Sequence, residues 1–250
     1  MTAALDISGL YKRFGALPVS SDIHLTLERG ARHALIGPNG AGKTTLINLI
    51  TGALTPDAGS VRLEGRDITR LTPEARVTRG LARTFQINQL FTGLTVLENV
   101  TLSISERTGL GGNLWRRASR ASQAIDEAMG LLQKLKLEDD ALTVIRELPY
   151  GRQRLVEIAI TLGQNPKVLL LDEPAAGVPS AESHIILDVI SALPDEIAIL
   201  IIEHDMEVVF SFADTISVMV GGSILVEGTP DEIARDPEVR AVYLGEAADV

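Results

Sequence analysis

The sequence predicts an α/β fold built on a mainly parallel sheet, and three observations lead to this prediction. Residues 168–171 and 197–202 are continuous aliphatic runs, as expected of strands that are covered on both faces. The apolar run Ala34–Ile36 precedes a glycine-rich loop at 37–45, and Leu46–Ile50 after that loop has the composition of a helix. Strand, loop, helix and then further buried strands separated by amphipathic segments is the element order of an α/β core.

The amino-terminal part predicts a second layer of strands. The segments 6–10, 23–27 and 60–63 have the pattern of short, half-buried strands. We expect them to form an antiparallel layer beside the parallel sheet.

The carboxyl-terminal part predicts a hairpin followed by a helix. Two apolar runs flank Gly221 and Gly222, a pair that is typical of a two-residue hairpin turn. The segment Thr229–Glu232 has a capping threonine, proline at the first helical position and glutamate three residues after the threonine. It therefore predicts the start of a helix.

Between about 88 and 160 the pattern becomes helical. Apolar residues between 124 and 137 recur at helical spacing. We expect one domain over residues 1–250, with an α/β core formed by 1–87 and 161–250 and a helical subdomain at 88–160. The basic segment 106–120 is either a contact element or a solvated face.

Composition excludes several classes of function. The 250 residues carry a net charge of −10 and include no cysteine. Disulfides and thiol chemistry are therefore excluded. The acidic balance argues against nucleic acid as a partner, because neutralising its phosphates requires a surplus of Lys and Arg. No apolar run approaches the roughly 20 residues of a membrane span, and the first residues lack the pattern of a secretion signal. We expect a cytoplasmic chain.

The loop at 37–45 has the phosphate-binding pattern G-x-x-x-x-G-K-[ST], in the strand and helix context that the motif requires. Glycines let backbone N–H groups approach phosphate oxygens without obstructing side chains. Lys43 is suited to contact the β- and γ-phosphates, and the hydroxyl of Thr44 to bind Mg²⁺. The expected nucleotide-contacting residues are Gly37, Asn39, Gly40, Gly42, Lys43, Thr44 and Thr45.

Two acids follow the buried run that ends at residue 171. Asp172 is suited to coordinate Mg²⁺, directly or through water, and Glu173 to polarise a water that attacks the γ-phosphate. Pro174 predicts an extended backbone at Glu173, because proline disfavours the helical region for the residue before it. The alternative is that these acids only cap the next helix.

His204 and Gln86 complete the expected constellation. His204 follows the buried run that ends at residue 202, where ligand sites of α/β sheets lie, so it could contact the γ-phosphate and hold the attacking water. A lone histidine is otherwise usually structural. Gln86, at the junction into the helical segment, could sense Mg²⁺ or water, although by itself it would be an ordinary surface amide.

Taken together, these motifs resemble the ATPase subunit of an ATP-binding cassette (ABC) transporter over essentially the whole chain. Their order is the phosphate loop, Gln86, the segment 148–154, the Asp172-Glu173 pair and His204. The resemblance implies a P-loop NTPase core that binds ATP and Mg²⁺. It also implies a head-to-tail dimer, in which each ATP lies between the phosphate loop of one subunit and the signature segment of the other.

The resemblance implies two further nucleotide contacts. Gly151 belongs to the signature segment, which serves the ATP of the other subunit. Phe14 matches the aromatic residue that stacks on adenine. Tyr11 is a weaker choice, and either ring could instead belong to the core.

Several stretches look like the importers of branched-chain and other hydrophobic amino acids. They are residues 83–86, 172–177, 202–206 and 243–246, together with the basic segment 106–120. Related amide or urea importers, lipopolysaccharide-export ATPases and an ATP-binding regulatory module with weak turnover stay open. An ATPase of the same superfamily that acts on DNA or ribosomes is not favoured, because the chain has neither a long coiled-coil insert nor a second cassette.

The signature segment departs from the family pattern Leu-Ser-Gly-Gly-Gln. Pro149 stands at the Ser position and offers a phosphate neither a hydroxyl nor an N–H group. Arg152 stands at the Gln position and could add positive charge. Pro179 stands where the family often has an Asp that communicates between subunits.

These departures affect only the contacts to the other subunit's ATP. We therefore expect a heterodimer with a second ABC ATPase subunit. The resemblance places this dimer on transmembrane permease subunits at the inner face of the cell membrane, served indirectly by a solute-binding protein.

Overall fold

The computed structural model describes residues 3–84, 90–109 and 117–246. The chain divides into two compact units. The first comprises Met1–Leu81, Lys167–Glu173 and Pro194–Val250, and the second comprises Ala82–Pro166 and Pro174–Leu193. The first unit contains two β-sheets with helices, and the second is mostly helical. The predicted α/β class is therefore confirmed.

The core of the first unit is a six-stranded sheet with strand order β10-β9-β3-β8-β7-β6. Its strands are β3 (Arg32–Ile36), β6 (Leu81–Arg83), β7 (Val168–Asp172), β8 (Ala198–Ile202), β9 (Thr215–Val220) and β10 (Ser223–Gly228). β8 pairs parallel with both β3 and β7, β3 pairs parallel with β9, and β10 pairs antiparallel with β9. β7 and β8 are buried at every residue, which explains their continuous aliphatic sequences.

The second sheet is antiparallel and has the strand order β2-β1-β4-β5. Its strands are β1 (Leu5–Phe14), β2 (Leu17–Leu27), β4 (Ala58–Leu63) and β5 (Arg66–Asp67). The predicted antiparallel layer is confirmed, but β1 and β2 are longer than expected. Their exposed ends continue to pair as a hairpin around Gly15, where φ is 61°.

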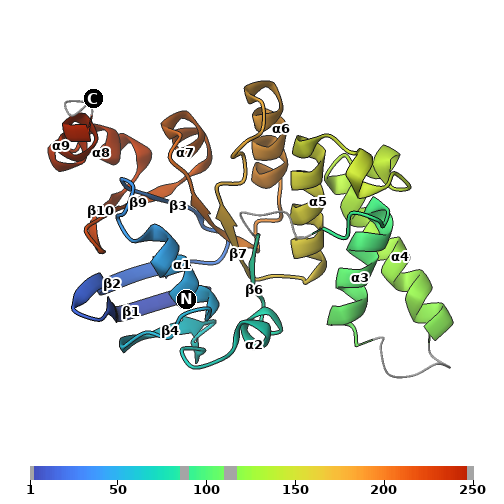
Figure 1. Ribbon diagram of the computed structural model, residues 1–250, viewed down its shortest axis with the longest axis horizontal. Coiled ribbons are helices and arrows are strands. Elements are labelled where there is room, and N and C mark those ends of the chain that lie inside the picture. Colours follow the sequence, from blue (N-terminus) through green and yellow to red (C-terminus); the bar gives the residue numbers. More distant parts are fainter. Residues whose placement is uncertain (1–2, 85–89, 110–116, 247–250) are drawn as a thin grey trace. The chain divides into compact units, whose positions relative to one another are not determined.

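Helix α1 (Lys43–Thr51) packs between the two sheets (Figure 1). Its buried aliphatic side chains share one hydrophobic cluster with residues of both sheets, among them Ile7 of β1 and Leu200 of β8. Because both faces of α1 are packed, the position of the loop that precedes it is fixed as well.

The first unit also contains α2 (Pro73–Val77), α7 (Met206–Phe212), α8 (Pro230–Arg235) and α9 (Pro237–Glu246). The predicted start of α8 is confirmed. The Thr229 N–H donates to the Glu232 carboxylate at 2.8 Å, and the Thr229 hydroxyl accepts from the Glu232 N–H. The predicted hairpin is also present, with positive φ at Gly221 and Gly222.

The second unit is helical, as the apolar spacing predicts. It contains α3 (Val96–Arg107), α4 (Arg117–Lys134), α5 (Tyr150–Gly163), α6 (Ser180–Ser191) and the short 3₁₀ helices η3 (Glu138–Asp140) and η4 (Ile145–Glu147). Its limits differ from the expected 88–160, because the unit runs from Ala82 to Pro166 and also takes in Pro174–Leu193. That second segment carries α6, which packs against α5.

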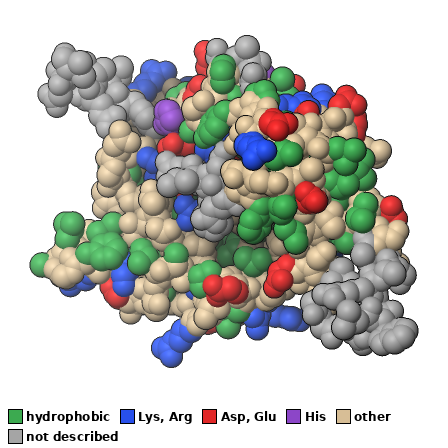
Figure 2. All heavy atoms as spheres, turned by 45° about the vertical axis from the view of Figure 1, so that its right-hand side comes forward, with side chains coloured by type: hydrophobic (Ala, Val, Ile, Leu, Met, Phe, Trp, Pro, Cys, Tyr) green, Lys and Arg blue, Asp and Glu red, His purple; other side chains and the backbone are tan. Residues whose placement is uncertain are grey.

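The helices of the described residues and one face of the molecule bear on the predicted absence of a membrane span and on the distribution of charge. No helix of the described residues combines the length and the apolar character needed to cross a bilayer. On the face seen in Figure 2, Lys and Arg side chains are interspersed with acidic and apolar side chains. Residues 110–116 of the basic segment lie outside the described residues.

Candidate nucleotide-binding site

The loop between β3 and α1 requires glycine at three positions with positive φ. The φ angle is 152° at Gly37, 80° at Gly40 and 103° at Gly42. A Cβ atom at Gly37 would lie 2.1 Å from the carbonyl oxygen of Met219, and one at Gly42 would lie 2.8 Å from that of Val19. Packing against β9 and β2 therefore excludes side chains at these two positions, whereas Gly40 is required only by its backbone conformation.

The loop brings the amino end of α1 and one lysine together. Gly42 precedes the helix without a side-chain cap, so the N–H groups of the first turn lack intrahelical acceptors. Lys43 Nζ donates to the carbonyl oxygens of Gly37 at 2.5 Å and Pro38 at 3.0 Å, so this side chain folds back over the loop. Asn39, Gly40 and Thr44 are exposed, and Thr45 is half-buried. Helix N–H groups beside an ammonium group form an arrangement that binds phosphate.

The acidic pair and the histidine follow strands that end at the same level. Ile202 at the end of β8 lies opposite both Leu35 of β3 and Asp172 of β7. The residues that come next on each strand therefore emerge at one edge of the sheet, beside the phosphate loop. The structure brings the loop, Asp172, Glu173 and His204 together in this way, as predicted for ligand sites of parallel sheets.

Glu173 and His204 face each other at this edge. His204 Nδ1 lies 3.7 Å from Glu173 Oε1 and 3.9 Å from Oε2 of the buried Glu203. The imidazole is largely exposed, whereas the Glu173 carboxylate is mostly buried. His204 is therefore not a core histidine, and its second ring nitrogen is available to a ligand.

The expected extended conformation of Glu173 is wrong. Its φ is 47°, in the left-handed region. The Glu173 N–H donates to the carbonyl oxygen of Ile202 at 2.9 Å, so the backbone pairs with β8 up to this residue and then turns sharply. Pro174 disfavours the right-handed helical region, but it does not by itself select the extended one. A non-glycine residue held in this region is strained and often functional.

Oxygen ligands suitable for Mg²⁺ are present. Asp172 is buried at the strand end, and the Thr44 hydroxyl is exposed in the first turn of α1. In the described part of the chain, no three acidic or histidine side chains gather into a metal-binding group. Mg²⁺ prefers oxygen ligands and usually takes several of them from phosphates and water, so the carboxylate of Asp172 and the hydroxyl of Thr44 fit this ion.

The aromatic residues proposed for adenine are exposed. Phe14, the last residue of β1, is 49% exposed, and Tyr11 is 40% exposed. The alternative that these rings belong to the core is therefore wrong. Lys12 Nζ lies over the Phe14 ring, 5.9 Å from its centroid. The stacking itself stays a prediction.

The signature segment lies at the amino end of α5 in the second unit. Pro149 precedes the helix without a side-chain cap, and Gly151 is buried in its first turn. Arg152, which could add positive charge, is paired with an acid. Its Nε donates to Asp140 Oδ2 at 2.6 Å, and its Nη2 forms an ion pair with the same oxygen. Asp140, which the sequence reasoning did not identify, thus neutralises Arg152.

Tyr150 is a further residue of the signature segment that the sequence reasoning missed. A Cβ atom at Gly177 would lie 3.4 Å from its ring, and Arg154 lies 5.4 Å from the ring centroid. Tyr150 therefore connects the segment at 148–154 with the loop that leads to Pro179, so the two altered segments lie in contact. Their motifs, read separately, gave no signal of this contact.

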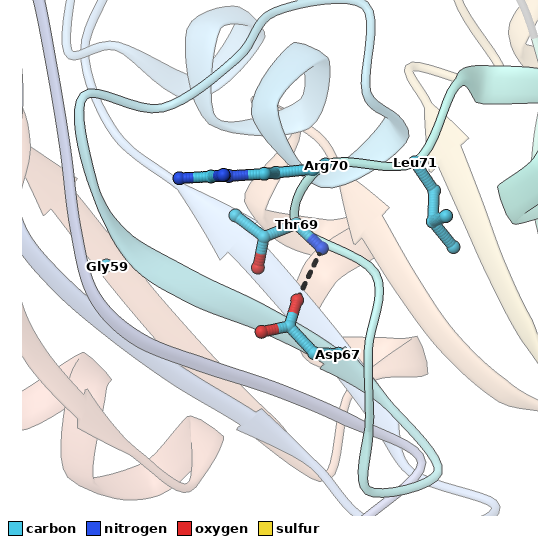
Figure 3. A pocket seen from close by; sticks show the side chains of 5 residues that line it. All are labelled: Gly59, Asp67, Thr69, Arg70 and Leu71. Atoms are coloured by element: carbon cyan, nitrogen blue, oxygen red, sulfur yellow. Dashed lines mark hydrogen bonds between the residues drawn. The ribbon is translucent and has the colours of Figure 1, made fainter.

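Gln86 lies outside the described residues. A surface pocket of the first unit is lined by Gly59, Asp67, Thr69, Arg70 and Leu71 and contains none of the predicted site residues (Figure 3).

Two family models match the chain. A model described as ABC transporter matches residues 20–176. A model described as branched-chain amino acid ATP-binding cassette transporter matches residues 223–249. The first match contains the phosphate loop, the signature segment and the acidic pair.

Curated proteins and solved structures agree with these matches. The high-affinity branched-chain amino acid transport ATP-binding protein LivG of Salmonella typhimurium is 39% identical over 97% of this chain and 98% of its own length. The corresponding protein BraF of Pseudomonas aeruginosa is 38% identical over 97% and 98%. A nucleotide-free cassette from an ABC transporter has a TM-score of 0.82 and 33% identity, covering 96% of this chain and 98% of that one. A cassette in its ADP conformation has a TM-score of 0.83 and 33% identity, covering 98% and 100%.

Proposed function

The chain belongs to the ABC transporter family, and we propose that it is the ATP-hydrolysing subunit of an importer of branched-chain or other hydrophobic amino acids. The main observation that supports ATP hydrolysis is the Glu173–His204 pair at the sheet edge beside the phosphate loop. The substrate class is supported by the names of the relatives and by the match of residues 223–249. Amide, urea and lipopolysaccharide systems are the alternatives.

The phosphate loop binds the nucleotide. Lys43, which donates to the carbonyl oxygens of Gly37 and Pro38, turns to the β- and γ-phosphates, while the N–H groups of the loop and of α1 donate to the remaining phosphate oxygens. Thr44 and Asp172 would hold Mg²⁺, which would withdraw charge from the phosphate oxygens when bound. Phe14 stacks on adenine.

Glu173 and His204 act on the attacking water. The Glu173 carboxylate accepts a proton from a water directed at the γ-phosphate. His204, held beside Glu173 by its Nδ1, offers its other nitrogen to a γ-phosphate oxygen. Both side chains emerge from the ends of adjacent strands, so their relative position is set by sheet register. Such positioning is most of what phosphoryl transfer requires from a protein.

The partners follow from the signature segment. Pro149 and the neutralised Arg152 make this chain a poor donor to a second ATP. We therefore infer a heterodimer, in which the partner supplies a complete signature to the ATP bound at Lys43. The dimer acts at the inner face of the cell membrane on two permease subunits, and a solute-binding protein delivers the amino acid.

Reconstitution tests this proposal. The chain, its neighbouring cassette subunit and the two neighbouring permeases are inserted in liposomes, and ATP hydrolysis is measured with the solute-binding protein. We expect stimulation by leucine, isoleucine or valine and little by urea or short amides. Stimulation by urea or amides alone would assign the chain to that group, and stimulation by no solute would favour the regulatory or export alternatives.

A further inference from the structure

Arg76 of α2 is a buried cation bound to the carboxyl end of α1. Its side chain is 1% exposed. Nη1 donates to the carbonyl oxygens of Leu49 at 2.8 Å and Ile50 at 2.5 Å, in the last turn of the helix. Nε and Nη2 donate to the carbonyl oxygens of Leu71 at 3.1 Å and Thr69 at 2.7 Å. The guanidinium thus satisfies carbonyl groups that a helix end leaves without partners.

The space around this guanidinium is tightly packed. A Cβ atom at Gly52, the residue after α1, would lie 2.7 Å from Arg76 Nε, and its φ of 83° also requires glycine. Thr69 and Leu71, which accept from Arg76, belong to the loop that lines the pocket of Figure 3. The Thr69 N–H donates to Asp67 Oδ1 at 2.8 Å and so holds that loop in shape.

The charge of Arg76 persists in the interior. Burial lowers the pKa of Arg76, and the Asp67 carboxylate opposes this shift. A guanidinium stays protonated at neutral pH in spite of such a shift. A cation at the carboxyl end of a helix is favourable to the helix dipole. In α1 the positive end of that dipole faces the phosphate loop.

The length of α1 separates Arg76 from the phosphate loop, and this separation is short for the electrostatic interaction of a buried charge. α1 has nine residues and is therefore about 13 Å long. Charges on the surface are largely screened over that separation, but a buried charge is screened much less.

We propose that Arg76 is a positioning residue for the nucleotide: it fixes the carboxyl end of α1 and supplies a buried positive charge that strengthens phosphate binding at the other end. Arg76 does not touch the nucleotide. The inference rests on the proposed ATP site at residues 37–45. A purely structural role would weaken the fold without distinguishing nucleotides by their charge.

The test compares ligands that differ only in phosphate number. Binding of ATP, ADP and AMP to the full chain is measured without Mg²⁺, by displacement of a fluorescent ATP analogue. For Arg76→Met we expect the Kd to rise about tenfold for ATP, about sixfold for ADP and about threefold for AMP, because Coulomb energy scales with ligand charge. Arg76→Lys keeps the charge with fewer donors. It should lose stability and shift each Kd by less than about threefold.

Arg32→Met is the matched control. The Arg32 side chain is mostly buried and also donates to backbone carbonyls, those of Gly30 and Ile197, but it stands at the amino end of β3 and pairs with Asp195. We expect a loss of stability with no dependence on phosphate number. If Arg76→Met does not fold, Arg76→Gln, which keeps one amide donor, is judged by the same criteria.

The outcomes separate this inference from the proposed function. A graded rise of Kd in Arg76→Met, absent from Arg32→Met, supports the role of Arg76. Equal changes for the three nucleotides, or the same gradation in Arg32→Met, would overturn it while leaving the ATP site intact. A wild-type chain that binds none of the three would overturn the proposed function itself.

Discussion

Nδ1 of His204 lies 3.7 Å from Oε1 of Glu173, across the ends of the adjacent strands β8 and β7. The register of the two strands, with Asp172 opposite Ile202, determines this approach. The mostly buried carboxylate and the exposed imidazole therefore lie side by side at the sheet edge.

His204→Ala should lower the rate of ATP hydrolysis by about 10²-fold, as loss of one hydrogen-bond donor to a charged transition state does. Because the imidazole is exposed, the free energy of unfolding should change by no more than about 0.5 kcal/mol. The measurement is steady-state hydrolysis by the assembled transporter, with denaturant unfolding of the isolated chain. His24→Ala, an exposed histidine of β2, is the control and should leave hydrolysis unchanged. A normal rate in His204→Ala would remove the imidazole from the mechanism.

Phe14→Ala should weaken ATP binding by about 1–2 kcal/mol, because stacking of a base on an aromatic ring contributes energy of this size. Leu17→Ala is the matched control, since Leu17 pairs with Phe14 across the hairpin and is 65% exposed. Isothermal titration with ATP gives both affinities. Equal losses in the two variants would assign the effect to the hairpin rather than to the ring.

Restoring the signature should activate the partner's ATP. With Glu173→Gln present to silence the chain's own site, Pro149→Ser combined with Arg152→Gln should raise the remaining hydrolysis by about tenfold. The change adds a hydroxyl and an N–H group, and hydrogen bonds to charged groups contribute enough for this factor. Asp140→Asn alone breaks the ion pair with Arg152 but does not restore the missing hydroxyl and N–H donors. It therefore distinguishes the effect of the ion pair from the effect of the donors. An unchanged rate after full restoration would mean that the altered signature does not limit that site.

His33, near the amino end of β3, is buried in a hydrogen-bonded chain. The Ser217 hydroxyl donates to Glu227 Oε2 at 2.6 Å, so its oxygen accepts from His33 Nε2 at 2.8 Å. Burial lowers the pKa of His33, and the Glu227 carboxylate partly opposes this shift. The folded protein therefore holds His33 neutral at pH values where the unfolded chain is already protonated.

Stability should consequently fall as the pH decreases below about 6.5, the pKa of histidine in an unfolded chain. The unfolded state binds the additional proton in this window, and the loss approaches about 1.4 kcal/mol per pH unit until the pH passes the lowered pKa. His33→Gln keeps a donor to Ser217 but cannot titrate. Urea unfolding between pH 7.5 and 5.5 should show a shallower slope for the variant, and equal slopes would exclude His33 as the source.

Local patterns predicted most of the elements and the residues of the candidate site that the structure brings to one sheet edge. Glycine spacing identified the phosphate loop, and aliphatic runs identified β7 and β8, because burial on both faces leaves a continuous apolar signal. The start of α8 was predicted in the same way, because its capping residues lie within four consecutive positions. Such features depend on neighbours in sequence, which one chain displays directly.

Features that depend on distant contacts were missed. The turn at Glu173 is stabilised by the carbonyl of Ile202 on another strand, so the rule for a residue before proline was insufficient. Asp140 neutralises Arg152 from a separate 3₁₀ helix. Arg76 in the sequence is an ordinary helix residue, and only the packed fold shows it bound to the end of α1.

The most direct test of the account is hydrolysis by the mixed dimer of this chain and its neighbouring cassette, measured with Glu173→Gln here or with the equivalent change in the partner. Since a positioned general base contributes at least about 10²-fold, Glu173→Gln should remove most of the activity, and the partner's change should remove much less. A larger loss from the partner's change, or full activity of a homodimer of this chain, would contradict the central claim that ATP at Lys43 is hydrolysed with a signature from another subunit.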